Sequence, residues 1–277
     1  MYCKVRNMEL AEIEIANYLA YKEGWNPGLN DGIAFYNTDT NGYFIAEINN
    51  RVVGCISAVK YSEDFGFIGF FIVENEYRNS PAGTKLALTA LNYLKNCNIG
   101  IDGVINRVAN YTNIGFKLAY KNIRFEGIGN NYPISEKVFN SNIVNFDEIL
   151  EYDSKCFPTK RTKFLPLWLN MLNAHSYVYY DNGVKGFGVI RPCKKGYKIG
   201  PLFADNLEIA DQIYQALASN ATDDIVYLDI PEANIKSSEL VKKYEMKQVF
   251  ETARMYNKYQ PPMDINKIFG ITSFELG

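Results

Sequence analysis

Apolar and polar positions alternate along the first half of the chain with the periods of strands and amphipathic helices. Over 9–21, apolar residues recur every three to four positions and fall near one face of a helix. Strands are predicted at 2–6, 43–48, 51–61, 65–73, 99–104 and 120–127. Helices are predicted at 9–21, about 31–35, about 82–96 and around Tyr111. The predicted order is β-α-α-β-β-β-α-β-α-β.

A stretch rich in turn-forming residues, 127–133, separates this half from a second one with a similar order. Helices are predicted there at 146–156, 162–173, 207–218 and 237–244. Strands are predicted at 177–180, 184–191, 197–203, 225–230 and 248–256. We interpret the chain as a degenerate internal repeat with a mixed α/β fold of the α+β class, in which antiparallel hairpins dominate.

Length and composition agree with this interpretation. The chain has 277 residues, enough for two domains of about 150 residues, and its 47% hydrophobic content is ordinary for a globular protein. The formal net charge is −2 and no basic stripe is present, so we expect no nucleic-acid partner. No apolar run approaches the roughly 20 residues that span a bilayer, so we expect no membrane association. Five scattered cysteines without a C-x-x-C pair indicate buried, reduced thiols and a cytoplasmic location.

The only histidine, His175, restricts the chemistry of the protein. A Ser-His-Asp triad or a histidine metal site would have to use this residue, which lies in a polar junction before an apolar run. We therefore expect a structural or exposed histidine and no metal site. The 21 tyrosines are expected mainly at half-buried strand positions.

The candidate chemistry lies where the strand 65–73 meets the next helix. The loop at 74–84 reads Glu-Asn-Glu-Tyr-Arg-Asn-Ser-Pro-Ala-Gly-Thr. A strand that leads through small residues into a helix N-terminus forms an anion site, because free backbone N–H groups and the helix dipole both favour negative charge. Small residues also let a pyrophosphate approach the backbone closely. The loop is therefore a candidate phosphate-binding loop.

Two motifs carry a resemblance to a known family. Residues 78–86 resemble the R-x-x-G-x-G/A motif of the GNAT N-acetyltransferases, and residues 111–116 resemble their later Y-x-x-x-G-F motif. Further segments are similar to a bacterial subgroup in which a GNAT domain precedes a second, GNAT-like (YitH-type) domain; they are 23–28, 54–59, 122–127, Arg161, 199–201 and 268–277. The resemblance implies tandem domains, each a mostly antiparallel mixed sheet flanked by helices. Residues 1–128 would form the acetyl-CoA-binding catalytic domain, and 133–277 a degenerate GNAT-like domain.

The resemblance also implies which residues bind acetyl-CoA as the co-substrate. The end of the strand aligns the pantetheine arm like an additional strand, and the loop and helix N-terminus bind the pyrophosphate. The implied residues are Phe71, Ile72, Val73, Arg78, Asn79, Ser80, Pro81, Ala82, Gly83 and Thr84. Pro81 stands where the family usually has its first motif glycine, and proline lacks that N–H. Because proline is tolerated at the first position of a helix, we expect a site of lower affinity rather than its loss.

For catalysis, the resemblance implies direct attack of an amine on the thioester, without an acyl-enzyme. Tyr111 matches the general acid of the family, which protonates the leaving thiolate; the alternative is a tyrosine that only packs. The general base is not identified. Glu23, Glu47 and Asp102 are the carboxylates near the expected site, and a water relay or no enzymic base would also serve.

The acceptor site is expected at the loop after the first helix, which contains Glu23, Trp25 and Asn26. The alternative for Trp25 is that it packs the loop onto the core. The expected acceptor is a small-molecule amine or an exposed amino group of a peptide, and the expected assembly is a monomer or homodimer. In the second half, Asp205 and Glu208 of the equivalent loop would repel a pyrophosphate, so we expect no acetyl-CoA there.

The sequence thus favours an acetyl-CoA-dependent N-acetyltransferase. The alternative is a catalytically weak acetyl-CoA-binding or sensing protein that acts through a partner. Pro81 and the lack of a carboxylate on the strand 65–73 are the features that favour this alternative.

Overall fold

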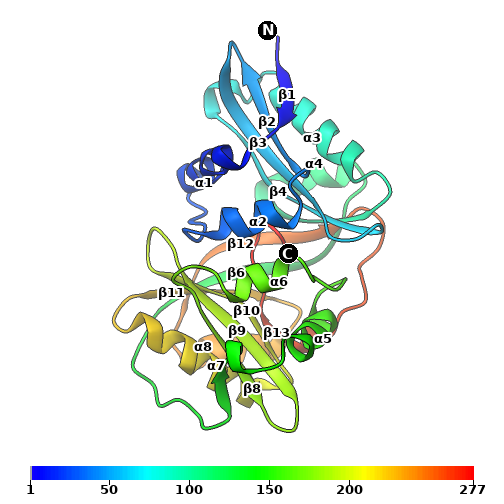
Figure 1. Ribbon diagram of the computed structural model, residues 1–277. Helices are drawn as coiled ribbons and strands as arrows, with labels where there is room; N and C mark the ends of the chain where they lie inside the picture. Colours follow the sequence, from blue (N-terminus) through cyan, green and yellow to red (C-terminus); the bar gives the residue numbers. More distant parts are fainter. Residues whose placement is uncertain (1) are drawn as a thin grey trace.

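The computed structural model describes residues 2–277, and their strands join into one sheet of 13 strands with helices on its faces (Figure 1). The strands are β1 (Lys4–Asn7), β2 (Tyr43–Ile48), β3 (Arg51–Lys60), β4 (Phe65–Val73), β5 (Asn98–Val104), β6 (Lys117–Ile128), β7 (Val138–Asn140), β8 (His175–Tyr180), β9 (Val184–Pro192), β10 (Tyr197–Ala204), β11 (Ile225–Pro231), β12 (Lys247–Tyr256) and β13 (Ile268–Gly270). The helices are α1 (Ile13–Lys22), α2 (Asp31–Thr38), α3 (Ala82–Tyr93), α4 (Val108–Asn113), α5 (Phe146–Cys156), α6 (Phe164–Leu169), α7 (Leu207–Ala218) and α8 (Ile235–Lys243). The bounds of β2, β4, α5 and α7 are those predicted from the pattern.

The first half follows the predicted order. β1 to β4 pair as an antiparallel meander, and β4 pairs in parallel with β5. Asn49 and Asn50 form the turn between β2 and β3 with φ of 52° and 60°, the left-handed conformation that two-residue hairpins require. The apolar residues Ala82, Leu86 and Ala90 of α3 are buried on one face of the sheet, and α1 and α2 cover the other face.

The second half repeats this plan. β7 to β10 pair as an antiparallel meander, and β10 pairs in parallel with β11. The pattern missed the short strands β7 and β13. It also predicted a helix at 162–173, whereas α6 ends at Leu169, before a turn in which Asn173 has φ of 60°.

The two halves exchange their last strands. β12, from the second half, inserts between β5 and β6 of the first half, and β6 pairs on its other edge with β11. The predicted mixed α/β fold with mostly antiparallel pairing and flanking helices is confirmed, but the halves share one sheet. Periodicity predicts strands and not their partners, so it does not reveal this exchange. The predicted boundary between domains 1–128 and 133–277 falls between β6 and β7 and divides no strand. The division into two domains stays a prediction.

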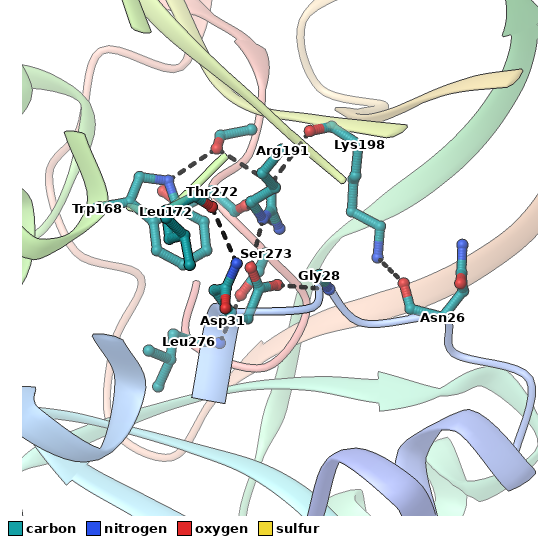
Figure 2. A network of polar contacts seen from close by, with 12 residues as sticks. Asn26, Gly28, Asp31, Trp168, Leu172, Arg191, Lys198, Thr272, Ser273 and Leu276 are labelled. Atoms are coloured by element: carbon teal, nitrogen blue, oxygen red, sulfur yellow. Dashed lines mark hydrogen bonds and ion pairs between the residues drawn. The ribbon is translucent and has the colours of Figure 1, made fainter. Parts of the chain in front are cut away.

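The halves also share a core between α2 and α6. Phe35 of α2 stacks on Trp168 of α6, with ring centroids 5.4 Å apart. The described residues also form four buried ion pairs: Arg124–Asp229, Arg161–Asp153, Arg191–Asp31 and Arg254–Asp102. Figure 2 shows one that joins the halves, with Arg191 of β9 donating to Asp31 at the start of α2.

The segment 271–277, which follows β13, lies buried between the two halves (Figure 1). On the side of the second half, Arg161 donates to the Thr272 hydroxyl over 2.9 Å. On the side of the first half, the Tyr61 hydroxyl donates to the Leu276 carbonyl over 3.2 Å. The segment is therefore fastened to both halves.

The structure also bears on the predictions about membrane-spanning helices, the cysteines and His175. None of the helices in residues 2–277 is long and apolar enough to cross a membrane. All five cysteines are buried and free. His175 begins β8 with an exposed side chain.

Candidate active site

The parallel strands β4 and β5 separate part of the way along their length. They pair only as far as Ile68 and Ile101. A bulge lies just beyond this point, because Phe70 of β4 has φ of 46° and the register between β3 and β4 shifts there. Bulges bend a strand and turn its edge. The edge of β4 beyond Ile68 therefore faces a wedge-shaped opening between the two strands.

A pocket occupies this opening, and its empty space, including the part open to solvent, is about 590 Å³; we call it the wedge pocket. Its strand walls are residues 68–71 of β4 and 101–104 of β5. The remaining walls come from elements far apart in the sequence; they are Trp25, Tyr111, Phe250, Thr252, Phe274 and Glu275. The structure thus brings three of the predicted site residues, Trp25, Phe71 and Tyr111, to one pocket.

The loop between β4 and α3 has the geometry of an anion site. The first backbone hydrogen bond of α3 runs from the Lys85 amide to the Pro81 carbonyl, and the Ala82 amide donates to the Ser80 hydroxyl. Among the described residues, the amides of Gly83 and Thr84 donate to no backbone carbonyl. Unpaired amides at a helix N-terminus attract anions.

Two predicted ligands, Arg78 and Glu23, bind each other. The Arg78 guanidinium donates to Glu23 over 2.6 Å and to the Val73 carbonyl over 3.1 Å. These contacts fix the end of β4 against the end of α1. Glu23 does not line the wedge pocket, and its role as an acceptor ligand stays a prediction that this geometry does not favour.

Asn26, another predicted acceptor ligand, binds residues of the second half. Its side chain exchanges two hydrogen bonds with the backbone of Lys195, at 2.9 and 3.2 Å, and its carbonyl accepts from the Lys198 ammonium. Figure 2 shows this last contact. Burial and the neighbouring Arg124 lower the pKa of Lys198. Asn26 therefore fastens the loop of the first half to the second half, while Trp25 beside it lines the pocket.

Tyr111 is held against β5. Its ring lies on Gly103, where a Cβ would come within 2.5 Å of the ring carbon Cε2. Burial raises the pKa of the Tyr111 phenol above its ordinary value, and Arg107 lowers it by less. The phenol is therefore protonated at neutral pH and available as a proton donor at the wall of the pocket.

The carboxylates considered as bases are paired with arginines. Glu47 accepts a hydrogen bond from Arg6. Asp102 accepts two hydrogen bonds from Arg254, one from Nε and one from Nη2. Burial raises the pKa of Asp102 in spite of this pairing. Sequence reasoning missed Glu275, which lines the pocket from the segment 271–277. The one signal for it is an acid placed between Phe274 and Leu276 in an otherwise uncharged segment.

The equivalent opening in the second half is filled by the chain itself. β10 and β11 pair in parallel as far as Ile199 and Leu228, and β13 then pairs with β10 from Leu202. The N-terminus of α7 is capped by Asn206, whose side chain accepts from the Ile209 amide. This half therefore offers neither a free strand edge nor an uncapped helix of the kind seen beside β4.

Comparisons with known proteins agree with the two-part geometry. The family model described as "Acetyltransferase (GNAT) family" matches residues 9–116, and the one described as "Acetyltransferase (GNAT) domain" matches residues 149–270. Holothin acyltransferase from Pseudoalteromonas sp. (strain SANK 73390) is 31% identical over 271 residues, which cover 97% of this chain and 92% of that protein.

Solved structures share the fold over nearly the whole chain. A putative acetyltransferase from Pyrococcus horikoshii has a TM-score of 0.86 at 22% identity, covering 100% of this chain and 98% of that one. A tandem GNAT protein from the clavulanic acid biosynthesis pathway has a TM-score of 0.63 at 9% identity, covering 92% and 98%. The chain belongs to the GNAT family of acyltransferases, and its second half is a second GNAT-like domain.

Proposed function

We propose that this acyltransferase uses acetyl-CoA and transfers the acetyl group directly to the amine of an acceptor. One observation carries the proposal. The free edge of β4 leads from unpaired amides at the start of α3 into the pocket that Tyr111 lines. The kinship with a protein named holothin acyltransferase supports acyl transfer in general.

The residues at the opening fit the parts of acetyl-CoA. The amides of Gly83 and Thr84 suit a pyrophosphate, because they point out of a helix N-terminus with its partial positive charge. The edge of β4 from Gly69 to Phe71 offers backbone groups to the amides of the pantetheine arm, as a neighbouring strand would. Arg78 holds the Val73 carbonyl and so keeps the end of this edge in place.

The chemistry requires a neutral amine, a polarised thioester and a proton for the leaving thiolate. In the proposed mechanism the amine nitrogen attacks the thioester carbon, and the bond from that carbon to sulfur breaks. Tyr111 gives its proton to the sulfur. Its raised pKa keeps the phenol protonated until that step.

Acetylation of an amine panel by the full chain, followed by mass spectrometry, tests the proposal. We expect acetylated product from wild type and a turnover about 10²- to 10⁴-fold lower for Tyr111→Phe, the usual contribution of a general acid. Calorimetry should show that Tyr111→Phe still binds acetyl-CoA. An absence of both transfer and binding at millimolar acetyl-CoA would end the proposal.

A second candidate is a weak acetyl-CoA-binding protein that acts through a partner. Two features favour low affinity for acetyl-CoA. Arg78 already donates to Glu23 and to the Val73 carbonyl, and Pro81 has no N–H to donate to a phosphate. Acetyl transfer to any amine at an ordinary enzymatic rate excludes this candidate.

A further inference from the structure

Buried polar atoms without partners gather beside the wedge pocket. Among the described residues, the hydroxyls of Tyr43 and Ser57 and both carboxylate oxygens of Glu275 are buried and lack a hydrogen-bond partner. Strand register places Tyr43 opposite Ser57 and Ser57 opposite Gly69. The backbone of Glu275 lies against Gly69, because a Cβ on Gly69 would overlap the Glu275 carbonyl oxygen. Such unpartnered atoms mark a place where water or a ligand completes the hydrogen bonding.

Glu275 differs from the four buried aspartates of the ion pairs described above. Each of those four aspartates accepts hydrogen bonds from an arginine. Glu275 is 2% exposed, yet its carboxylate contacts no donor in residues 2–277. An unpaired buried carboxylate is costly to hold in a fold, and a cationic ligand would offset that cost.

Three buried cations interact with the charge of Glu275 from beyond hydrogen-bond distance. They are Arg124, Arg191 and Lys198, and Glu275 acts to raise the pKa of each. Arg124 and Arg191 bind aspartates, and Lys198 donates to the backbone of the loop that contains Trp25. None of these cations donates a hydrogen bond to the carboxylate, so the hydrogen-bonding capacity of both oxygens is unused. Both oxygens are buried in this structure, so a ligand reaches them only when neighbouring side chains move.

Most of the other walls of the pocket are apolar; the polar residues among them are Asp102, whose carboxylate is paired with Arg254, Thr252 and Tyr111. Trp25, Phe71, Phe250 and Phe274 present aromatic rings to the pocket. The Arg124 guanidinium lies over the Phe274 ring, 4.6 Å from the ring centre, and donates to the Trp25 carbonyl over 2.8 Å. Arg124 thus holds the Phe274 ring and the backbone of Trp25 in place. Rings in such an arrangement suit a flat apolar body, and a single charged group fixes its orientation.

We propose that Glu275 is the receptor for the amino group of the acceptor, and that the acceptor is a small amine with a flat, apolar body. This inference rests on the proposed function, since it names the substrate class and the amine-binding residue of the same pocket. It also gives the second half a direct part in the site. The segment 271–277 carries Phe274 and Glu275 into the opening of the first half.

The carboxylate also receives a proton in the transfer. An ammonium bound to Glu275 passes one proton to the carboxylate, and the freed lone pair of nitrogen forms the C–N bond. The C–S bond breaks with its electron pair on sulfur, which takes a proton from Tyr111. Nitrogen gives its second proton to water. Glu275 then releases its proton and Tyr111 regains one through water, so one proton is released for each amide formed.

Calorimetry with benzylamine and benzyl alcohol tests the inference without any turnover. The two probes share a ring and differ in charge at neutral pH. Wild type should bind benzylamine about tenfold to hundredfold more tightly than the alcohol, the range for hydrogen bonds to a charged group. Glu275→Gln should bind the two probes alike and should lower kcat/KM for amines by a similar factor.

Matched variants keep the test decisive. Glu251→Gln is the control, because the Glu251 carboxylate on the neighbouring β12 pairs with Lys121 at 3.3 Å; it should keep the preference for the amine. Melting temperatures check that the variants fold, and Glu275→Met, of similar length without charge, repeats the comparison. A folded Glu275 variant that keeps the amine preference overturns the inference, as does a wild type without that preference. If wild type prefers benzylamine but acetylates no amine of the panel, the proposed acetyl transfer is refuted and Glu275 remains an amine-binding residue.

Discussion

Gly103 of β5 offers a way to move the Tyr111 ring without changing its chemistry. A Cβ at this position would lie 2.5 Å from Cε2 and 2.8 Å from Cδ2 of the tyrosine. Carbon atoms in ordinary contact are about 3.5–4.0 Å apart, so in Gly103→Ala the ring must withdraw by about 1 Å. A displacement of about 1 Å at a reacting group costs about a hundredfold in rate. We therefore expect kcat to fall about a hundredfold, with little change in the affinity for acetyl-CoA.

The assay measures release of the coenzyme A thiol with a chromogenic disulfide, using an acceptor found in the amine panel. Gly127→Ala on β6 is the control. Its Cβ would meet the Met246 side chain at 2.8 Å, and neither residue lines the wedge pocket. The flexible methionine therefore moves aside without changing the site. This variant should retain the wild-type kcat. The double variant Gly103→Ala/Tyr111→Phe should be no slower than Tyr111→Phe, because both changes remove the same proton donor.

Two results would refute this reasoning. A wild-type kcat in a folded Gly103→Ala protein would show that the position of the Tyr111 ring does not matter. Losses that multiply in the double variant would show that Gly103 acts on the rate by a route that does not pass through the phenol.

Three further outcomes are expected. Calorimetry should find one acetyl-CoA bound per chain, since β13 fills the second opening; two sites would contradict that interpretation. Pro81→Ala restores an N–H at the start of α3 and should tighten acetyl-CoA binding about tenfold, as a hydrogen bond to a charged group of roughly 1.5 kcal/mol would; an unchanged Kd would show that this amide does not face the phosphates. Arg191→Met leaves Asp31 buried without its partner and should lower the free energy of unfolding by about 3–5 kcal/mol in a urea titration, whereas a loss under 1 kcal/mol would mean that water reaches the aspartate.

Local features of the fold were predictable because their causes are local. The strands β2 and β4 are apolar runs bounded by turn residues, and the loop before α3 combines small residues with a helix start. Tyr111 follows β5 by a short interval, so its place near the opening also follows from neighbouring sequence. These features depend on residues within about twenty positions of one another, so the pattern of apolar and polar residues along the chain predicts them.

Long-range features were not predictable. The salt bridge between Arg78 and Glu23 joins residues 55 positions apart, and it changes what both residues are free to bind. Glu275 looks like an exposed acid in sequence, and its burial depends on the path of the segment 271–277 between two halves. Partners of this kind are set by tertiary packing, which no local period encodes.

The exchange of β6 and β12 has a consequence for the order in which the protein assembles. During synthesis, β5 emerges about 150 residues before β12, the strand that must pair with it, as the contact between Val104 and Thr252 shows. Until then the first half exposes an unpaired strand edge, which is a template for aggregation. Pairings so distant along a chain also slow folding, because a long loop must close first. Neither half completes its own sheet, so a gene for this protein cannot be divided at the linker without leaving each product with an open edge.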